Sequence, residues 1–226
     1  MCAIKYNYYK KLFFIFLRTK RYKMEIDVAI LHLEKDDLLK EVIQTTKLSP
    51  FTPSGNVYFN LLESIVSQQL SVTVADTIFK RFCTLFPDNN PSPEILKIMD
   101  INLLRAAGLS NQKAAYLKNV ADFTLDNDLE NYSWHNLTDP EVISFLTQIK
   151  GVGQWTAEMI LMFTLNRPDV FPADDLGIQQ AMTRLYSIAE TGKDFRKKML
   201  IISEPWRPYR TIACRYLWRW KDNKKA

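Results

Sequence analysis

Residues 146–158 decide the fold, and they read LTQIKGVGQWTAE. Apolar residues follow helical spacing up to Lys150, and the same spacing resumes at Ala157 after two glycines. Because glycine adopts backbone angles that are closed to other residues, residues 151–153 are predicted to form the turn of a helix-hairpin-helix, with a plain helix C-cap and tight turn as the alternative. In a hairpin, backbone N–H groups point outward at the positive end of the second helix and suit a phosphate. The predicted phosphate-binding residues are Gly151, Gly153, Gln154 and Thr156.

The composition predicts a folded, helical protein. Hydrophobic residues make up 47% of the 226 residues, which is enough to bury a core in one domain or in two small lobes. The chain has only six glycines and no sustained alternation of apolar and polar residues, so a sheet is not expected. The fold class is therefore predicted to be all-α.

The net charge of +5 says little about partners. Residues 1–23 hold seven basic residues and no acidic one, so subtracting those seven charges from +5 leaves −2 for the remaining chain. A protein that binds a nucleic acid needs only a local basic face, which net charge does not reveal.

The cysteines and histidines exclude several kinds of site. Three scattered cysteines suit a reducing compartment and cannot form a four-cysteine iron–sulfur cluster. His32 and His135 are the two histidines, and no zinc-type spacing exists. No cofactor is therefore expected in catalysis.

The first 23 residues are unlike the rest. Their apolar stretch, residues 12–17, is too short to cross a bilayer, and no small-residue cleavage site follows it. Met24 directly precedes an amphipathic segment, so residues 1–23 are predicted to be a non-native or disordered extension. A membrane-surface anchor and an organelle-targeting peptide are the alternatives, and no stable membrane association is expected.

Turn-forming residues divide the remaining chain into segments with helical spacing. The expected helices span residues 27–47, 58–67, 71–86, 101–107, 112–126, 140–150 and 176–186, and an aromatic-basic segment spans 206–221.

One helix after the hairpin, residues 171–175 read FPADD. A glycine hairpin followed by such a loop resembles the HhH-GPD superfamily of DNA base-excision glycosylases, over roughly residues 58–221. The resemblance implies two helical lobes with a cleft for DNA and the target base between them. The terminal lobe would comprise residues 24–56 and 176–226, and the central lobe residues 57–175.

Asp175 stands at the position of the family's catalytic aspartate. Cleavage of an N-glycosidic bond builds positive charge on the sugar, so a carboxylate beside C1′ and an activated water are required. Asp174 is expected to cap the following helix instead.

The target base lies inside the duplex and must be rotated out. Residues 67–71, SQQLS, resemble the turn that relatives push into the base stack. The resemblance makes Gln69 the first candidate for the intercalating wedge and Leu70 the second, with a plain helix–helix corner as the alternative.

Trp155 bears on the reaction type. Relatives that also cleave the strand carry a nucleophilic lysine at this place. A tryptophan there implies a monofunctional hydrolase without lyase activity, and its indole suits a cationic alkylated purine. A tryptophan at a helix start can equally be part of the core.

Residues 206–218, WRPYRTIACRYLW, resemble the C-terminal segment of the AlkA-type 3-methyladenine DNA glycosylase II group, in its short all-helical form. The resemblance places Trp218 in the base pocket. It implies N3- and N7-alkylated purines as substrates, such as 3-methyladenine and 7-methylguanine, with ethenoadenine and hypoxanthine as further candidates.

The family's hairpin also binds a monovalent cation, K⁺ or Na⁺, through main-chain oxygens. By position these belong to Thr147, Ile149 and Val152. The expected partner is double-stranded DNA containing alkylated purines. We expect a monomer in the cytoplasm, associated with the nucleoid in a bacterium, or in the nucleus of a eukaryote.

Two other functions fit parts of the sequence. One is a glycosylase of the same fold for another base, such as uracil or mismatched adenine. The other is a non-catalytic helix-hairpin-helix DNA-binding protein, in which Asp175 would be incidental.

Overall fold

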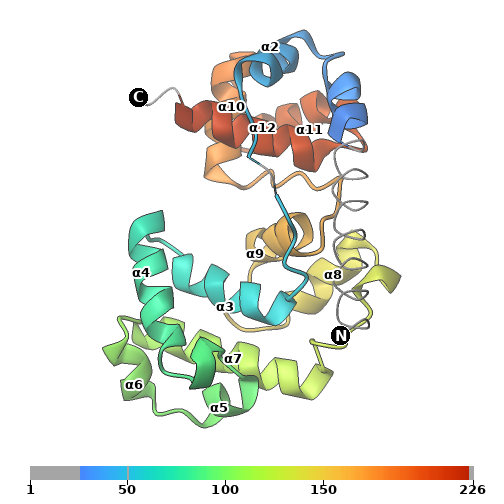
Figure 1. The fold of residues 1–226 in the computed structure, drawn as a ribbon. Coiled ribbons are helices and arrows are strands. Elements are labelled where there is room, and N and C mark those ends of the chain that lie inside the picture. The colour runs from blue at the N-terminus through green and yellow to red at the C-terminus, as the bar shows by residue number, and fades with distance from the viewer. Residues whose placement is uncertain (1–25, 50, 224–226) are drawn as a thin grey trace, which may run out of the picture. The chain divides into compact units, whose positions relative to one another are not determined.

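The computed structural model describes residues 26–49 and 51–223, and these form helices and loops without a strand (Figure 1). The chain divides into two compact units. Among the described residues, unit 1 comprises 26–49 and 171–223, and unit 2 comprises Phe51–Val170. The all-α prediction is confirmed for the described residues. None of their helices is long and apolar enough to cross a bilayer.

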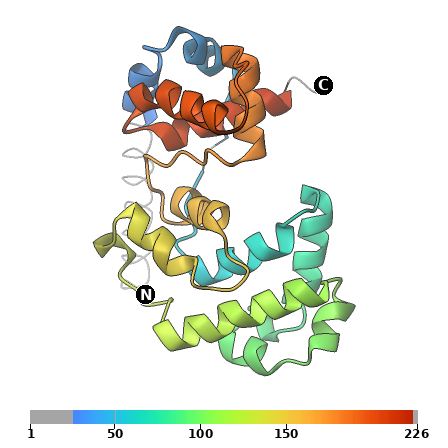
Figure 2. The same cartoon turned by 180° about the vertical axis from the view of Figure 1, so that it is seen from behind.

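Unit 2 is built around α7, Asn111–Asn127, which packs against α3, α5 and α6 (Figures 1 and 2). The side chains of Asn56, Ser92 and Ser110 accept N–H groups three residues on and thereby start α3, α5 and α7. The helices of this unit are α3 Val57–Ser67, α4 Val72–Cys83, α5 Pro93–Ile98, α6 Ile101–Ala106, α7, α8 Asp139–Leu146 and α9 Gln154–Met159, with short turns η1 Pro87–Asn89 and η2 Trp134–Asn136 and a π-helix η3 Ile160–Thr164.

Unit 1 joins the N-terminal segment to the C-terminal helices. Residues 26–33 are helical, and α2, α10, α11, η4 and α12 span Asp37–Thr45, Leu176–Tyr186, Gly192–Ser203, Glu204–Trp206 and Arg210–Asn223. α12 packs against α10 and α2, and its inner face and Trp206 are buried. Asp36 links these elements, because its carboxylate accepts the backbone N–H of Leu39, the Tyr186 hydroxyl and the Trp206 indole N–H. Burial first, and then the bond to Asp36, raises the pKa of Tyr186.

Several predicted boundaries differ from the structure. The helix expected over 27–47 is interrupted at residues 34–36, because Asp36 turns to cap α2. The helices expected over 71–86 and 140–150 end at Cys83 and Leu146, and α5 lies between the helices expected over 71–86 and 101–107, where no helix was predicted. The units divide at 50/51 and 170/171 rather than at 56/57 and 175/176. The extension predicted at residues 1–23 lies outside the described residues.

Candidate active site and nucleic-acid interface

Asp175 is the N-cap residue of α10 and belongs to unit 1. Its Oδ1 accepts the backbone N–H of Ile178 at 2.8 Å and the indole N–H of Trp218 at 2.7 Å. The structure therefore brings together Asp175 and Trp218, two of the predicted site residues that are far apart in sequence. Two donors on one oxygen fix the direction of the half-buried carboxylate.

Asp174 does not cap α10, so that expectation is wrong. Its Oδ1 pairs instead with Nε of Arg196 in α11 at 3.2 Å, on the surface. The cap falls to Asp175 because Asp175 is the last residue with extended backbone angles before the helix, with φ −72° and ψ 121°. Asp175 therefore caps α10 in addition to its predicted role in catalysis.

Gly177 is a site residue that we did not single out from the sequence. A Cβ built on it would lie 2.9 Å from Cδ1 of Trp218 and 3.0 Å from Oδ1 of Asp175. The missing side chain is what allows the indole to reach the carboxylate. The available signal was a glycine in the first turn of a predicted helix, where glycine costs about 1 kcal/mol relative to alanine.

The predicted hairpin turn follows α8 and leads directly into α9. Gly151 has φ 107°, and Gly153 is the N-cap residue of α9. A Cβ on Gly151 would lie 2.3 Å from Cγ of Tyr116, so the turn lies directly on α7. Gly153 and Gln154 are exposed, whereas Thr156 is buried and would offer only its backbone N–H.

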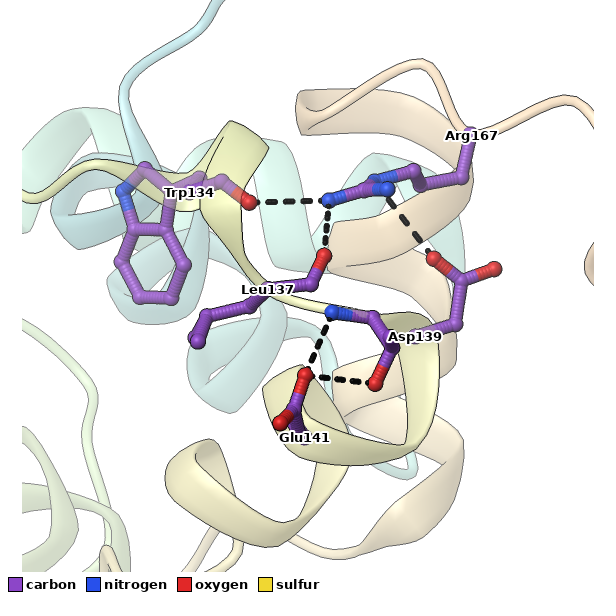
Figure 3. Close-up of polar contacts among 6 residues, drawn as sticks. Trp134, Leu137, Asp139, Glu141 and Arg167 are labelled. Atoms are coloured by element: carbon purple, nitrogen blue, oxygen red, sulfur yellow. Dashed lines mark hydrogen bonds and ion pairs between the residues drawn. The ribbon is translucent and has the colours of Figure 1, made fainter.

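The outer ends of the hairpin helices are held by Arg167 (Figure 3). Its Nη2 donates to the carbonyls of Trp134 and Leu137, both at 2.8 Å, and its Nε lies 3.4 Å from Oδ1 of Asp139, the first residue of α8. Hydrogen bonds from Thr138, through its hydroxyl and its backbone N–H, lower the pKa of Glu141 and close the first turn of α8. One side chain therefore joins the end of η3 to the start of α8.

We predict that Arg167→Met lowers the free energy of unfolding by about 1.5–3 kcal/mol, because two partly buried carbonyls lose a charged donor. Urea denaturation followed by circular dichroism measures this loss. The matched control is Arg196→Met, whose surface ion pair with Asp174 should contribute no more than about 1 kcal/mol. Equal losses in the two variants would contradict the role of Arg167.

The turn predicted to enter the base stack, residues 67–71, begins at the last residue of α3, and it is called the wedge turn below. Gln68 is the C-cap residue of α3, and Gln69 adopts the left-handed conformation with φ 58°. Both Gln69 and Leu70 are exposed. Their side chains are therefore placed on the surface of unit 2.

Trp155 is 40% exposed, so it is not a core residue. It lines a hollow of about 230 Å³ between α3 and the segment formed by α9 and η3. Asn60 and Glu63 contribute polar groups to this hollow, and Asn60 donates to Oγ1 of Thr164 at 3.0 Å. Thr164 ends the π-helix, a rare element that often occurs at functional sites.

The predicted residues thus form two groups, each in its own unit. Asp175 and Trp218 lie in unit 1, whereas the wedge turn, the hairpin and Trp155 lie in unit 2. A glycine hairpin, followed by one helical segment and a loop that ends in a capping aspartate, is the arrangement expected of a helix-hairpin-helix protein of the HhH-GPD kind. Residues 62–208 match the HhH-GPD superfamily of base excision DNA repair proteins, and the chain belongs to this family.

Relatives and solved structures agree with this assignment. The chain is 39% identical over 166 residues to DNA-3-methyladenine glycosylase 1 of Schizosaccharomyces pombe, covering 72% of this chain and 71% of that protein. A solved 3-methyladenine DNA glycosylase of the same yeast, in complex with abasic DNA, superposes with a TM-score of 0.74 at 34% identity, covering 87% and 96% of the two chains. A DNA-3-methyladenine glycosidase from Bacillus halodurans gives a TM-score of 0.70 at 34% identity, covering 85% and 88%.

Proposed function

We propose that this protein is a monofunctional DNA glycosylase that removes alkylated purines from double-stranded DNA and leaves an abasic site. The observation that carries the proposal is the Asp175 carboxylate, whose Oδ1 is held by the first turn of α10 and by the Trp218 indole. A carboxylate fixed in this way needs no reorganisation when charge develops beside it. Membership of the HhH-GPD family supports DNA as the substrate.

The chemistry follows from the charge that bond cleavage creates. As the N-glycosidic bond lengthens, the sugar becomes an oxocarbenium-like cation, which Asp175 stabilises at C1′. The same carboxylate accepts the proton of the attacking water. An N3- or N7-alkylated purine is already cationic and leaves readily, so no general acid is required.

Water is the nucleophile in this mechanism because Trp155 stands where a lysine would attack C1′. The half-exposed indole instead offers its face to the displaced base. Attraction between a cationic purine and an indole is worth about 0.5–2 kcal/mol. Substrate choice then depends on the charge and lability of the base.

Trp155→Ala is expected to slow release of 7-methylguanine by about three- to thirtyfold, because the cation–π attraction is lost. Single-turnover kinetics with a 7-methylguanine duplex measure the rate. Trp155→Phe keeps a weaker aromatic face and should lie between wild type and alanine. An unchanged rate in Trp155→Ala would remove the indole from the base pocket.

The hairpin carbonyls suit a structural cation. Thr147 is the C-cap residue of α8, and Thr147, Ile149 and Val152 carry main-chain oxygens around the turn. Oxygens beyond a helix end are hard, neutral ligands of the kind that hold K⁺ or Na⁺. Such an ion would supply positive charge next to a DNA phosphate. The protein is proposed to act as a monomer, in the cytoplasm or in the nucleus of a eukaryote.

Chromatography of bases released from methylated duplex DNA tests the proposed function. The wild type should release 3-methyladenine and 7-methylguanine and leave the strand intact. A covalent adduct trapped with borohydride would overturn the monofunctional assignment. DNA binding without base release would favour the non-catalytic binding protein.

A further inference from the structure

The wedge turn, residues 67–71, is held by a charged side chain from another helix. Nζ of Lys113, in the first turn of α7, donates to the carbonyls of Val66 at 2.8 Å and Gln68 at 2.7 Å. Both carbonyls belong to the end of α3, where no further helical turn provides donors. Lys113 is half-buried, and this burial lowers the pKa of its amine. A desolvated cation on two carbonyls makes strong hydrogen bonds.

A second contact ties the same turn to the hairpin. Nε2 of Gln68 donates to the carbonyl of Gly151 at 3.3 Å. α7 reaches the hairpin as well, because the Tyr116 ring lies against Gly151 and Nδ2 of Asn119 donates to the carbonyl of Lys150 at 3.1 Å. Successive turns of α7 therefore hold first the wedge turn and then the hairpin.

Gln69 gives an independent reason why the turn needs this support. Its φ of 58° is left-handed, a conformation that is strained for a residue other than glycine. Such a conformation persists only where the surroundings impose it. Here the surroundings impose it through hydrogen bonds. Lys113 donates to the carbonyls of Val66 and Gln68, and Gln68 donates to the carbonyl of Gly151 in the hairpin.

We propose that Lys113 is a positioning residue for base displacement. It fixes the wedge turn at a set place relative to the hairpin, so that Gln69 and Leu70 enter the duplex without first being ordered. This inference rests on the proposed function. Lys113 touches neither the base nor the reacting atoms, and it acts only on the step that opens the stack.

The proposal is tested by comparing two substrates that differ in how firmly the damaged base is held inside the duplex. One substrate carries 7-methylguanine paired with cytosine in a duplex, and the other carries the same base opposite an abasic site, where little displacement work remains. Lys113→Met should slow single-turnover release from the paired duplex about ten- to a hundredfold, the effect of losing charged hydrogen bonds. The expected loss on the unpaired base is less than about threefold. Lys113→Arg retains a donor and should restore most of the rate.

Lys118→Met is the matched control. Lys118 lies on the same helix and also donates to a carbonyl, that of Lys97 at 3.0 Å, but this bond ends at α5. The control should release both bases at wild-type rates. Thermal unfolding of all variants checks that they fold. If Lys113→Met does not fold, Gln68→Ala, which removes the bond to Gly151, should show the same selective loss.

The outcomes separate the two proposals. Equal loss on the two substrates, or rates in Lys113→Met and Gln68→Ala that match Lys118→Met, would overturn the positioning role and leave the proposed function intact. A wild type that releases neither base would overturn the proposed function and, with it, the role of the turn.

Discussion

Asp175→Asn is expected to abolish most base release, lowering the single-turnover rate by about 10²–10³-fold or more. The substitution removes the negative charge that would face the cationic sugar and the oxygen that would accept a proton from water. It keeps the shape of the side chain. The rate is measured with 3-methyladenine and 7-methylguanine duplexes at saturating enzyme.

Folding should be little affected by this change. The amide oxygen of asparagine can still accept the N–H groups of Ile178 and Trp218, and asparagine caps helices about as well as aspartate. A normal unfolding midpoint together with a large loss in the rate of base release would therefore show that Asp175 acts in catalysis as well as in capping α10. The thermal midpoint should shift by no more than that of a surface variant.

Asp174→Asn is the matched control, one residue away. Asp174 pairs with Arg196 on the surface, and its loss should leave the rate within about twofold of wild type because exposed ion pairs contribute little. Comparable rates in the two variants would show that Asp175 only caps α10. Another group would then have to stabilise the cationic sugar.

Much of the site could be predicted because its signals are local. The hairpin needs glycines at fixed offsets, and the helix over 176–186 begins after the predicted loop and ends at Tyr186, as expected. Local sequence could not show which of Asp174 and Asp175 caps the helix. Two adjacent carboxylates look alike in sequence, and only the backbone angle at each one decides which side chain meets the helix.

The individual long-range hydrogen bonds could not be predicted, although the family resemblance had placed Asp175 and Trp218 in one site. The Trp218 indole meets Asp175 across 43 residues, and Lys113 meets the end of α3 across 45 and 47 residues. No spacing rule connects such positions, because the fold brings them together only after the helices pack. The helix α5, in contrast, could have been predicted from local sequence. Ser92 followed by Pro93 and Glu94 is a typical helix start, but it lies in a proline-rich stretch that favours a loop.

Gly151→Ala is expected to cost about 2–5 kcal/mol of unfolding free energy, the largest stability loss that we predict. Two causes add together. The backbone at Gly151 has φ 107°, which an alanine rarely adopts, and its Cβ would lie 2.3 Å from Cγ of Tyr116. Either the ring or the turn must move. Because the exposed N–H groups of the hairpin depend on the turn, affinity for duplex DNA should also fall.

Gly153→Ala is the control two residues further on. Gly153 has φ −95°, and a Cβ there would meet nothing within 4 Å, so its cost should stay within about 1 kcal/mol. Urea denaturation and fluorescence anisotropy with a labelled duplex measure stability and binding in both variants. Combining Gly151→Ala with Tyr116→Ala should recover the part of the loss that comes from crowding and leave the part that comes from φ. A Gly151→Ala variant as stable as Gly153→Ala would mean that the turn is not held against α7, and the link between hairpin and wedge turn would fail with it.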